Sequence, residues 1–179
     1  SMIRTLSLLI FLNLSGFCLG QVQCDLPPEW RHSNYAGGSC AHASTESALE
    51  SNGEHAKAAW WRQTFAHGEY ENRHLQRLKN AGIKYMATFD GDEQLLIWAM
   101  ENRRMVIVYW PTMHVTNLVG RVLGKDGQYY AVILDNNHTK RYDTYLWSDW
   151  VKRWRRCSGV AFVIMSGEAR PPVPKPMGS

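Results

Sequence analysis

The sequence predicts an α+β fold with two lobes, a helical one first and an antiparallel β-sheet after it. Helical runs that end at glycines fill the first half of the chain, whereas short apolar runs separated by turns fill the second half. Asp126-Gly127 lies between two β-rich runs, which is typical of a hairpin. Helices segregated from an antiparallel sheet define the α+β class, and two such lobes can meet in a cleft.

Glycines mark the boundaries of the predicted helices. Gly37-Gly38 gives a sharp turn before the first helix, Gly53 stops that helix, and Gly82 closes the third. Asp90 or Asp92 caps the fourth helix. The expected helical ranges are 40–52, 54–65, 70–80 and from 90 or 92 to about 104, with a short strand at 83–89.

The second half is expected to form the sheet. Apolar runs predict strands, which cover 105–110, 114–123, 128–134 and 159–165. Trp147, Trp150 and Trp154 recur at helical spacing, so we expect a short helix with one aromatic face before the last strand.

The first 20 residues are typical of a secretory signal. Arg4 supplies the charged start, residues 6–19 are mostly apolar, and small residues near Gly20 offer a cleavage site. This run is too short for a transmembrane span, so we expect no stable membrane insertion. The sequence therefore predicts a secreted or periplasmic protein with one domain at 21–168 and a disordered, proline-rich tail at 169–179.

Removal of the signal leaves three cysteines, Cys24, Cys40 and Cys157. An odd number of cysteines in an exported protein indicates one disulfide and one free thiol. Cys24 and Cys157 lie near the two ends of the domain. We therefore predict a Cys24–Cys157 disulfide and a reduced Cys40.

Cys40 has the surroundings that a nucleophile needs. It follows Gly38 and Ser39, a candidate N-cap, so it is expected in the first turn of a helix, where the helix dipole favours a thiolate. The preceding glycines allow a substrate to approach the backbone closely. The backbone N–H of Cys40 and the side-chain amide of Asn34 are candidate donors to an oxyanion.

A base and an orienting group follow at the ends of two predicted strands. His114 begins one strand and Asp135 ends the next, so neighbouring strands can bring them together. Asp135 would fix the imidazole tautomer and stabilise the imidazolium, and Asn136 is the alternative orienting residue. A metal site at Cys40, His42 and His114 lacks four well-spaced ligands. We therefore expect neither a metal nor another cofactor.

These residues resemble those of the papain-like cysteine peptidases. Papain-type sequences have a glutamine six positions before the nucleophile and Gly-Ser-Cys around it, and Asn34 and residues 38–40 match this layout apart from Asn for Gln. The small bacterial branch that includes double-glycine leader peptidases has a histidine opening a glycine-ended strand and an aspartate ending the next. Residues 114–120 and 132–135 match that pattern, and the resemblance covers roughly 30–165.

The spacing favours the smaller branch over papain proper. His114 lies 74 residues after Cys40 (114 − 40), whereas the histidine of papain follows its cysteine by about 130–150 residues. The resemblance implies a papain-like fold, in which a helical lobe carrying the nucleophile helix packs on the sheet. It also implies hydrolysis of peptide bonds through a thioester.

Three functions remain open on sequence grounds. The first is an exported thiol peptidase or amidase that acts on peptides or proteins through Cys40, His114 and Asp135. The second is a catalytically inactive papain-like module that binds peptides or a partner protein, which the replacement at Asn34 keeps open. The third is acyl transfer to an amine by the same residues. The net charge of +4 is mild, so we expect no nucleic-acid partner, and we expect a monomer.

Overall fold

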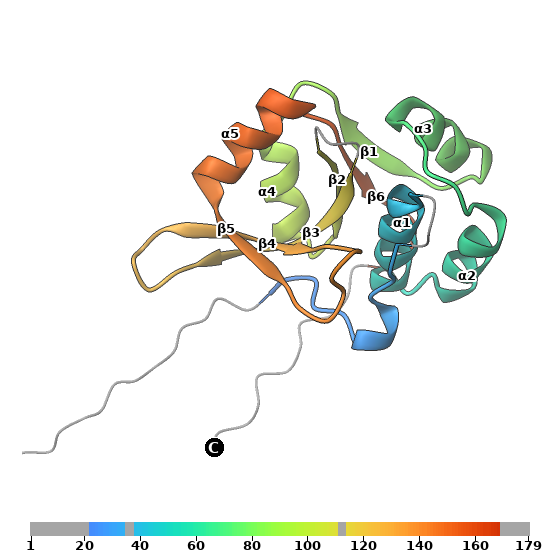
Figure 1. The fold of residues 1–179 in the computed structure, drawn as a ribbon, viewed down its shortest axis with the longest axis horizontal. Helices are drawn as coiled ribbons and strands as arrows, with labels where there is room; N and C mark the ends of the chain where they lie inside the picture. Colours follow the sequence, from blue (N-terminus) through green and yellow to red (C-terminus); the bar gives the residue numbers. More distant parts are fainter. Residues whose placement is uncertain (1–21, 35–37, 111–113, 169–179) are drawn as a thin grey trace, which may run out of the picture.

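Helices fill the first half of the chain and a sheet dominates the second half. The computed structural model describes residues 22–34, 38–110 and 114–168 (Figure 1). Its helices are η1 Pro28–Trp30, α1 Cys40–Ser51, α2 His55–Thr64, α3 Glu71–Asn80, α4 Glu93–Glu101 and α5 Trp147–Cys157. Its strands are β1 Tyr85–Thr88, β2 Val106–Tyr109, β3 Val115–Leu123, β4 Tyr129–Leu134, β5 Asp143–Leu146 and β6 Ala161–Ile164. The predicted α+β class is confirmed.

Two predicted segments lie outside the described residues. These are the signal sequence at 1–20 and the proline-rich tail at 169–179. Among the described helices, none combines the length and the apolar character that crossing a bilayer requires.

The strands form one antiparallel sheet of six, in the order β1-β6-β2-β3-β4-β5. The inner strands β2 and β6 are buried at every position, which explains their continuous apolar sequences. Strand β5 has no strand signal in the sequence, because Asp143-Thr144-Tyr145 is polar and partly exposed at the edge of the sheet. Asp92 is the cap of α4, since its carboxylate accepts from the backbone N–H of Gln94 at 2.9 Å.

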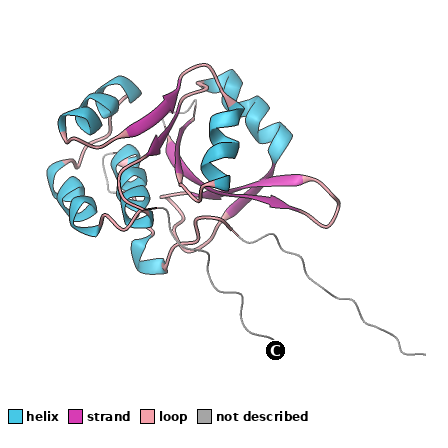
Figure 2. Cartoon of the chain, turned by 180° about the vertical axis from the view of Figure 1, so that it is seen from behind, coloured by secondary structure: helices cyan, strands magenta, loops and turns pink. Residues whose placement is uncertain are grey.

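Helices cover both faces of the sheet, as Figures 1 and 2 show. Asn117 of β3 points to α1 and donates to the carbonyl of Ser44 at 2.9 Å. Thr116, one residue earlier and therefore on the opposite face, accepts from the indole of Trp110 at 2.9 Å. Trp110 packs in turn against Trp150 of α5. Strand β3 thus separates α1 on one face from α5 on the other.

Helix α1 is buried along its whole length. All of its residues are buried, including several polar ones, because it lies between the sheet and α2 (Figure 1). Glu46 forms an ion pair with Arg62 of α2 at 3.0 Å. Burial raises the pKa of Glu46 to about 7, although Arg62 opposes the shift. The helix is therefore fixed by packing and by polar contacts on all sides.

Two histidines on and beside α1 are fully buried, His42 and His74. His74 lies 2.7 Å from the hydroxyls of both Thr45 and Tyr109. Because Thr45 donates its own proton to the carbonyl of Ala41, it accepts from Nε2 of His74, and Tyr109 donates to Nδ1. Burial lowers the pKa of His74 to about 3 and that of His42 to about 4. Both rings are therefore neutral near pH 7.

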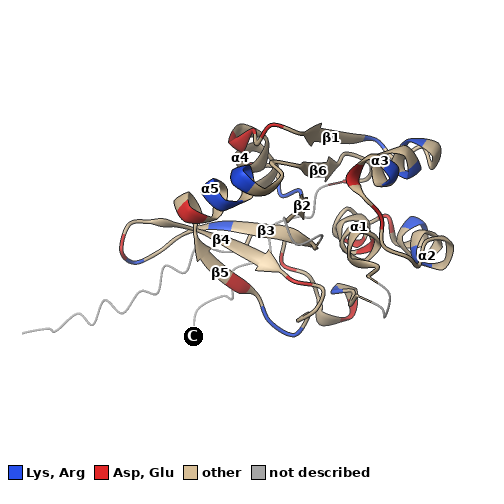
Figure 3. Cartoon of the chain, turned by 45° about the horizontal axis from the view of Figure 1, so that its top comes forward, with Lys and Arg blue, Asp and Glu red and all other residues tan. Residues whose placement is uncertain are grey.

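Helix α5 has the predicted aromatic face. Trp147, Trp150 and Trp154 are buried, and their neighbouring ring centroids are 5.6 and 6.1 Å apart. The indole of Trp154 donates to the carbonyl of Val160 at 3.1 Å, just before β6. The exposed positions of α5 are mostly basic, at residues 152, 153, 155 and 156, and Figure 3 colours basic positions of this helix blue. These indoles therefore attach α5 to the sheet.

The predicted Cys24–Cys157 disulfide is not formed. The described part of the chain contains no disulfide. The backbone N–H of Cys24 bonds to the carbonyl of Val119, whereas Cys157 ends α5 beside Tyr109, which pairs with Val115. These two anchor points are four residues apart along β3, about 13 Å. A disulfide requires Cα atoms within about 7 Å. Nearness of both cysteines to the ends of the domain did not imply nearness in space.

Trp154→Ala is expected to lower the free energy of unfolding by about 3–5 kcal/mol, because it removes a fully buried ring and its hydrogen bond. Trp60→Ala is the matched control, since Trp60 of α2 is 45% exposed, and should cost about 1 kcal/mol or less. Urea denaturation followed by circular dichroism measures both. Equal losses in the two variants would show that α5 is not attached through Trp154.

Candidate active site

Cys40 is the first residue of α1, as predicted, and its side chain is buried. The turn before it needs glycine, because Gly38 has a φ of +82°. Ser39 holds the N-cap position but makes no capping hydrogen bond, and its hydroxyl donates to Asn34 at 3.2 Å instead. The thiol lies 3.8 Å from the carbonyl oxygen of Gly38.

His114 and Asp135 meet where two strands adjoin. Asn117 of β3 pairs with Leu134 at the end of β4, so the residue before β3 and the residue after β4 lie side by side. Nε2 of His114 is 2.9 Å from Oδ1 of Asp135. Both side chains are about one-fifth exposed. The carboxylate therefore holds the imidazole from a rigid element while leaving it accessible.

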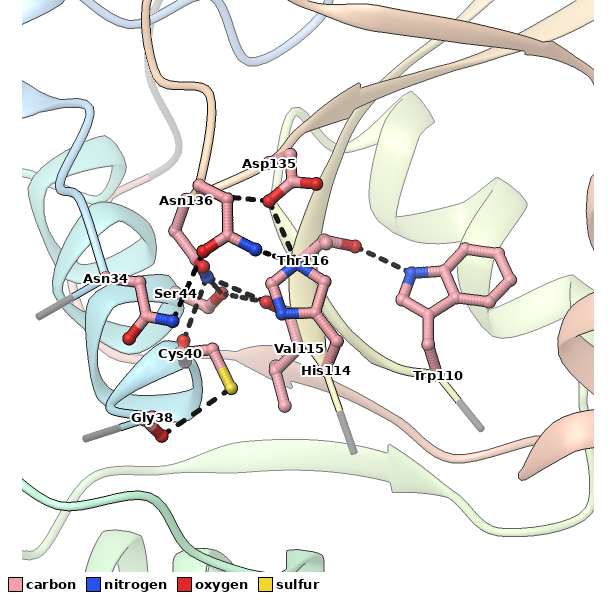
Figure 4. Close-up of polar contacts among 11 residues, drawn as sticks. Asn34, Gly38, Cys40, Ser44, Trp110, His114, Val115, Thr116, Asp135 and Asn136 are labelled. Atoms are coloured by element: carbon pink, nitrogen blue, oxygen red, sulfur yellow. Dashed lines mark hydrogen bonds and ion pairs between the residues drawn. The ribbon is translucent and has the colours of Figure 1, made fainter. Parts of the chain in front are cut away.

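The imidazole lies between the carboxylate and the thiol. Figure 4 shows one ring nitrogen of His114 directed to Asp135 and the second, Nδ1, on the side of Cys40. A hydrogen bond joins the side chains of His114 and Cys40. The structure thus brings together the three residues that the sequence indicated, from α1, the start of β3 and the end of β4.

The electrostatics favour a thiolate and an imidazolium. Burial opposes ionisation of Cys40, but hydrogen bonds from His114 and at the Val115 and Ala41 backbone outweigh it and lower the pKa of the thiol. The hydrogen bond to Asp135, followed by that to Cys40, raises the pKa of His114 to about 9. Burial likewise disfavours the ionised form of Asp135. The hydrogen bond to His114 outweighs burial and keeps the pKa of the Asp135 carboxyl below its usual range. A proton thus resides on the imidazole at neutral pH.

Asn136 connects the elements that carry the nucleophile and the base. Its buried amide nitrogen donates to three oxygens, at 3.1 Å to the carbonyl of Cys40, 3.0 Å to the hydroxyl of Ser44 and 2.7 Å to the carbonyl of Val115. It therefore joins α1 to the start of β3. Because Asp135 makes the contact with His114, the orienting position considered for Asn136 is occupied by its neighbour.

Asn34 lies beside the site and is held at three points. Its backbone N–H donates to the carbonyl of Asn136 at 2.8 Å. Its amide oxygen accepts from Ser39, and its amide nitrogen lies 3.3 Å from the side-chain oxygen of Asn137. Asn137 also lies 3.4 Å from Nε2 of His114. The donor that could serve an oxyanion is thus engaged through a long, exposed bond that a substrate oxygen can replace.

Three residues at the site, Trp110, Ser44 and Asn137, carry no functional signal in the sequence. Trp110 looks like the end of an apolar strand, yet it lines a cavity together with His114 and Asp135, and its indole donates to Thr116 (Figure 4). Ser44 follows Cys40 by one helical turn, which a test for polar residues on the nucleophile's face of α1 would have found.

Two hollows flank the reactive pair. The thiol cavity has a volume of about 500 Å³. The imidazole cavity has a volume of about 360 Å³ and contains His114 and Asp135. Trp110 lines both. The residues around the thiol cavity are Gly38, Cys40, His67, Gly68, Glu69, Tyr70, Glu71, Tyr109, Trp110, Cys157 and Ser158. In the described ranges no group of three or more His, Cys, Asp or Glu residues is arranged to hold a metal ion.

Comparison with known proteins gives a structural similarity. No protein-family model matches the sequence, and no curated protein matches it. A solved structure, a double glycine motif protease from an AMS/PCAT transporter in complex with the leader peptide, superposes with a TM-score of 0.51. The superposition covers 82% of this chain and 95% of the protease chain, at 16% sequence identity. The chain has a papain-like fold. At this identity the similarity concerns the fold and leaves activity to the site itself.

Alkylation of Cys40 should depend strongly on His114. Iodoacetamide is expected to label Cys40 of the native protein rapidly at pH 6–7, below the ordinary titration range of cysteine. In His114→Ala the burial that raises the pKa of Cys40 remains while the opposing hydrogen bond is lost, so labelling at pH 7 should slow by about tenfold or more. Mass spectrometry of the Cys40 peptide across a pH series measures this. Identical pH profiles in the two proteins would contradict the ion pair.

Asn136→Ala should lower the free energy of unfolding by about 2 kcal/mol, because three buried oxygens lose their shared donor. Asn137→Ala is the control, since Asn137 is exposed, and should cost less than about 0.5 kcal/mol. Guanidinium denaturation curves decide between them. A native-like stability of Asn136→Ala would mean that α1 is held to β3 by other contacts.

Proposed function

We propose that the protein is a cysteine peptidase or amidase that hydrolyses peptide bonds through Cys40, His114 and Asp135. One observation carries the proposal: His114 bonds to Asp135 through Nε2 and to Cys40 on its other side. A nucleophile, its base and an orienting carboxylate in that contact order are the minimal equipment for acyl transfer.

The geometry assigns each residue a step. The Cys40 thiolate attacks the carbonyl carbon, and His114 then gives its proton to the leaving amine, which breaks the peptide bond and leaves a thioester. His114, now neutral, takes a proton from water as the water attacks the thioester. The C–S bond then breaks, the acid product leaves, and Cys40 is released as a thiolate beside the protonated His114. Asp135 keeps the ring oriented and stabilises each imidazolium.

The oxyanion requires donors that become available only with substrate. The backbone N–H of Cys40 at the start of α1 is one, and the helix dipole supports it. Asn34 supplies the second when its amide turns from Asn137 to the substrate oxygen. The resemblance of the site to the double-glycine leader peptidase branch, and the peptide carried by the superposed protease, favour a peptide as substrate.

The inactive peptide-binding module remains the second candidate. The engaged amide of Asn34 favours it, because a permanently occupied donor would leave the oxyanion weakly stabilised. We also propose, from residues 1–20, that the protein acts outside the cytoplasm, as a secreted or periplasmic monomer.

Cys40→Ala should abolish hydrolysis of a peptide library and leave the fold intact, because no other group replaces the thiolate. Cys24→Ala is the matched control, since the backbone of Cys24 bonds to Val119 in the middle of β3 and Cys24 does not line the thiol cavity, and should retain activity. Mass spectrometry of the products and circular dichroism measure the two properties. Hydrolysis by Cys40→Ala would end the proposal, and a folded native protein that binds but never cleaves peptides would favour the inactive module.

The rate should also follow the two titrations. Activity is expected to rise as Cys40 ionises and to fall as the pH passes about 9, because His114 then lacks the proton that the leaving amine requires. A pH profile of kcat/KM tests this. Activity that keeps rising to pH 10 would remove His114 from the role of proton donor.

A further inference from the structure

The thiol cavity has a charge opposite to that of the protein. The chain carries a net charge of +4, yet the charged residues that line this cavity are Glu69 and Glu71. Among its described lining residues there is no lysine or arginine. A substrate segment beside Cys40 therefore meets carboxylates.

The two carboxylates are not equivalent. Glu69 is buried and pairs with Arg77, with Arg73 at 3.8 Å, so most of its charge is balanced. Its second oxygen, Oε2, is buried and lies 3.7 Å from Nε2 of His42, at longer than hydrogen-bond distance. Glu71 is the first residue of α3, where the helix dipole favours a carboxylate. No described lysine, arginine or histidine forms an ion pair with Glu71. An uncompensated negative charge thus lines the cavity.

Two tyrosine rings line the cavity beside the carboxylates. Tyr70 is 66% exposed beside Glu71, and Tyr109 lies deeper in the cavity. Burial, followed by the charges of Cys40, Glu71 and Glu69, raises the pKa of Tyr109. Its hydroxyl is neutral and committed to His74. The cavity therefore presents ring faces and a carboxylate, and lacks a free cationic donor among its described residues.

This combination suits a long cationic side chain. The aliphatic stem of lysine or arginine packs along aromatic surface while its charged end reaches a carboxylate. A volume of about 500 Å³ is ample for one such side chain. Gly68 to Glu71 form one wall of the cavity. This wall lies directly against the turn that precedes Cys40, because a Cβ at Gly68 would come 2.2 Å from the carbonyl oxygen of Gly38.

We propose that the thiol cavity binds a lysine or arginine side chain of the substrate close to the scissile bond, and that Glu71 selects it. This rests on the proposed peptidase function for its meaning, but not for its test. Glu69 lines the same cavity, but it is paired with Arg77 and its other oxygen faces His42, so the selection rests on Glu71.

The test compares peptides that differ at one position. Peptides with lysine or methionine, which have similar length, are placed in turn at each position around the cleaved bond. The native chain should favour lysine at one position by about tenfold in kcat/KM, which corresponds to about 1.4 kcal/mol. Glu71→Gln should reduce the ratio to less than about twofold, because it removes the charge and keeps the volume.

Two further variants make the test specific. Glu71→Lys should reverse the preference, so that glutamate is favoured over lysine at the same position. Glu29→Gln removes the same charge from the first turn of the exposed helix η1 and should leave the ratio at its native value. A native ratio in Glu71→Gln, or no preference for lysine at any position, would overturn the proposal.

A binding measurement separates this inference from the proposed activity. In Cys40→Ala, titration calorimetry should show tighter binding of the lysine peptide, and the added change Glu71→Gln should remove the difference. Lysine-selective binding without hydrolysis by the native chain would support the cavity and contradict the peptidase. Hydrolysis without a lysine preference would support the peptidase and contradict the cavity.

Discussion

The buried amide of Asn136 joins the helix that carries the nucleophile to the strand that carries the base. One NH₂ group is shared among three oxygens, two from α1 and one from Val115. The preceding residue, Asp135, bonds to His114. Two consecutive residues thus fix both sides of the proton-transfer path. Asn136 bonds both to α1 and to the start of β3, so it opposes any shift of one lobe relative to the other where the carboxylate, the imidazole and the thiol meet.

Burial of α1 complements this connection. A surface helix could tilt or fray, whereas α1 has the sheet on one side and α2 on the other, and its acidic side chain Glu46 is paired with Arg62. The first N–H groups of α1 are therefore fixed before any substrate arrives. Fixed dipoles stabilise a developing charge without the cost of reorienting during the reaction. Buried polar side chains on α1 are thus compatible with a catalytic site, although a buried helix without an apolar stripe is unusual.

The sequence predicted the parts of this structure that depend on local signals. Glycine turns located α1 and α3, strand ends placed His114 and Asp135 in adjacent positions, and helical spacing revealed the indoles of α5. The failures concern relations in space. The sequence leaves Asn136 open as an alternative to Asp135, because adjacency in sequence cannot show which way a side chain points; in the structure Asn136 bonds to α1 and Val115 instead. The Cys24–Cys157 pairing failed because positions along β3 are visible only once the register of the sheet is known.

The two buried histidines make the stability of the fold depend on pH. His42 and His74 have pKa values of about 4 and 3 in the folded chain, below the ordinary 6.5. The unfolded chain therefore binds more protons below pH 6.5, and the free energy of unfolding decreases as the pH falls from 6.5 towards 4. Glu46, with its pKa raised to about 7, opposes this between pH 4.5 and 7, but as one group against two. Acidification below pH 6.5 therefore lowers the free energy of unfolding, and these buried side chains make the fold acid-sensitive.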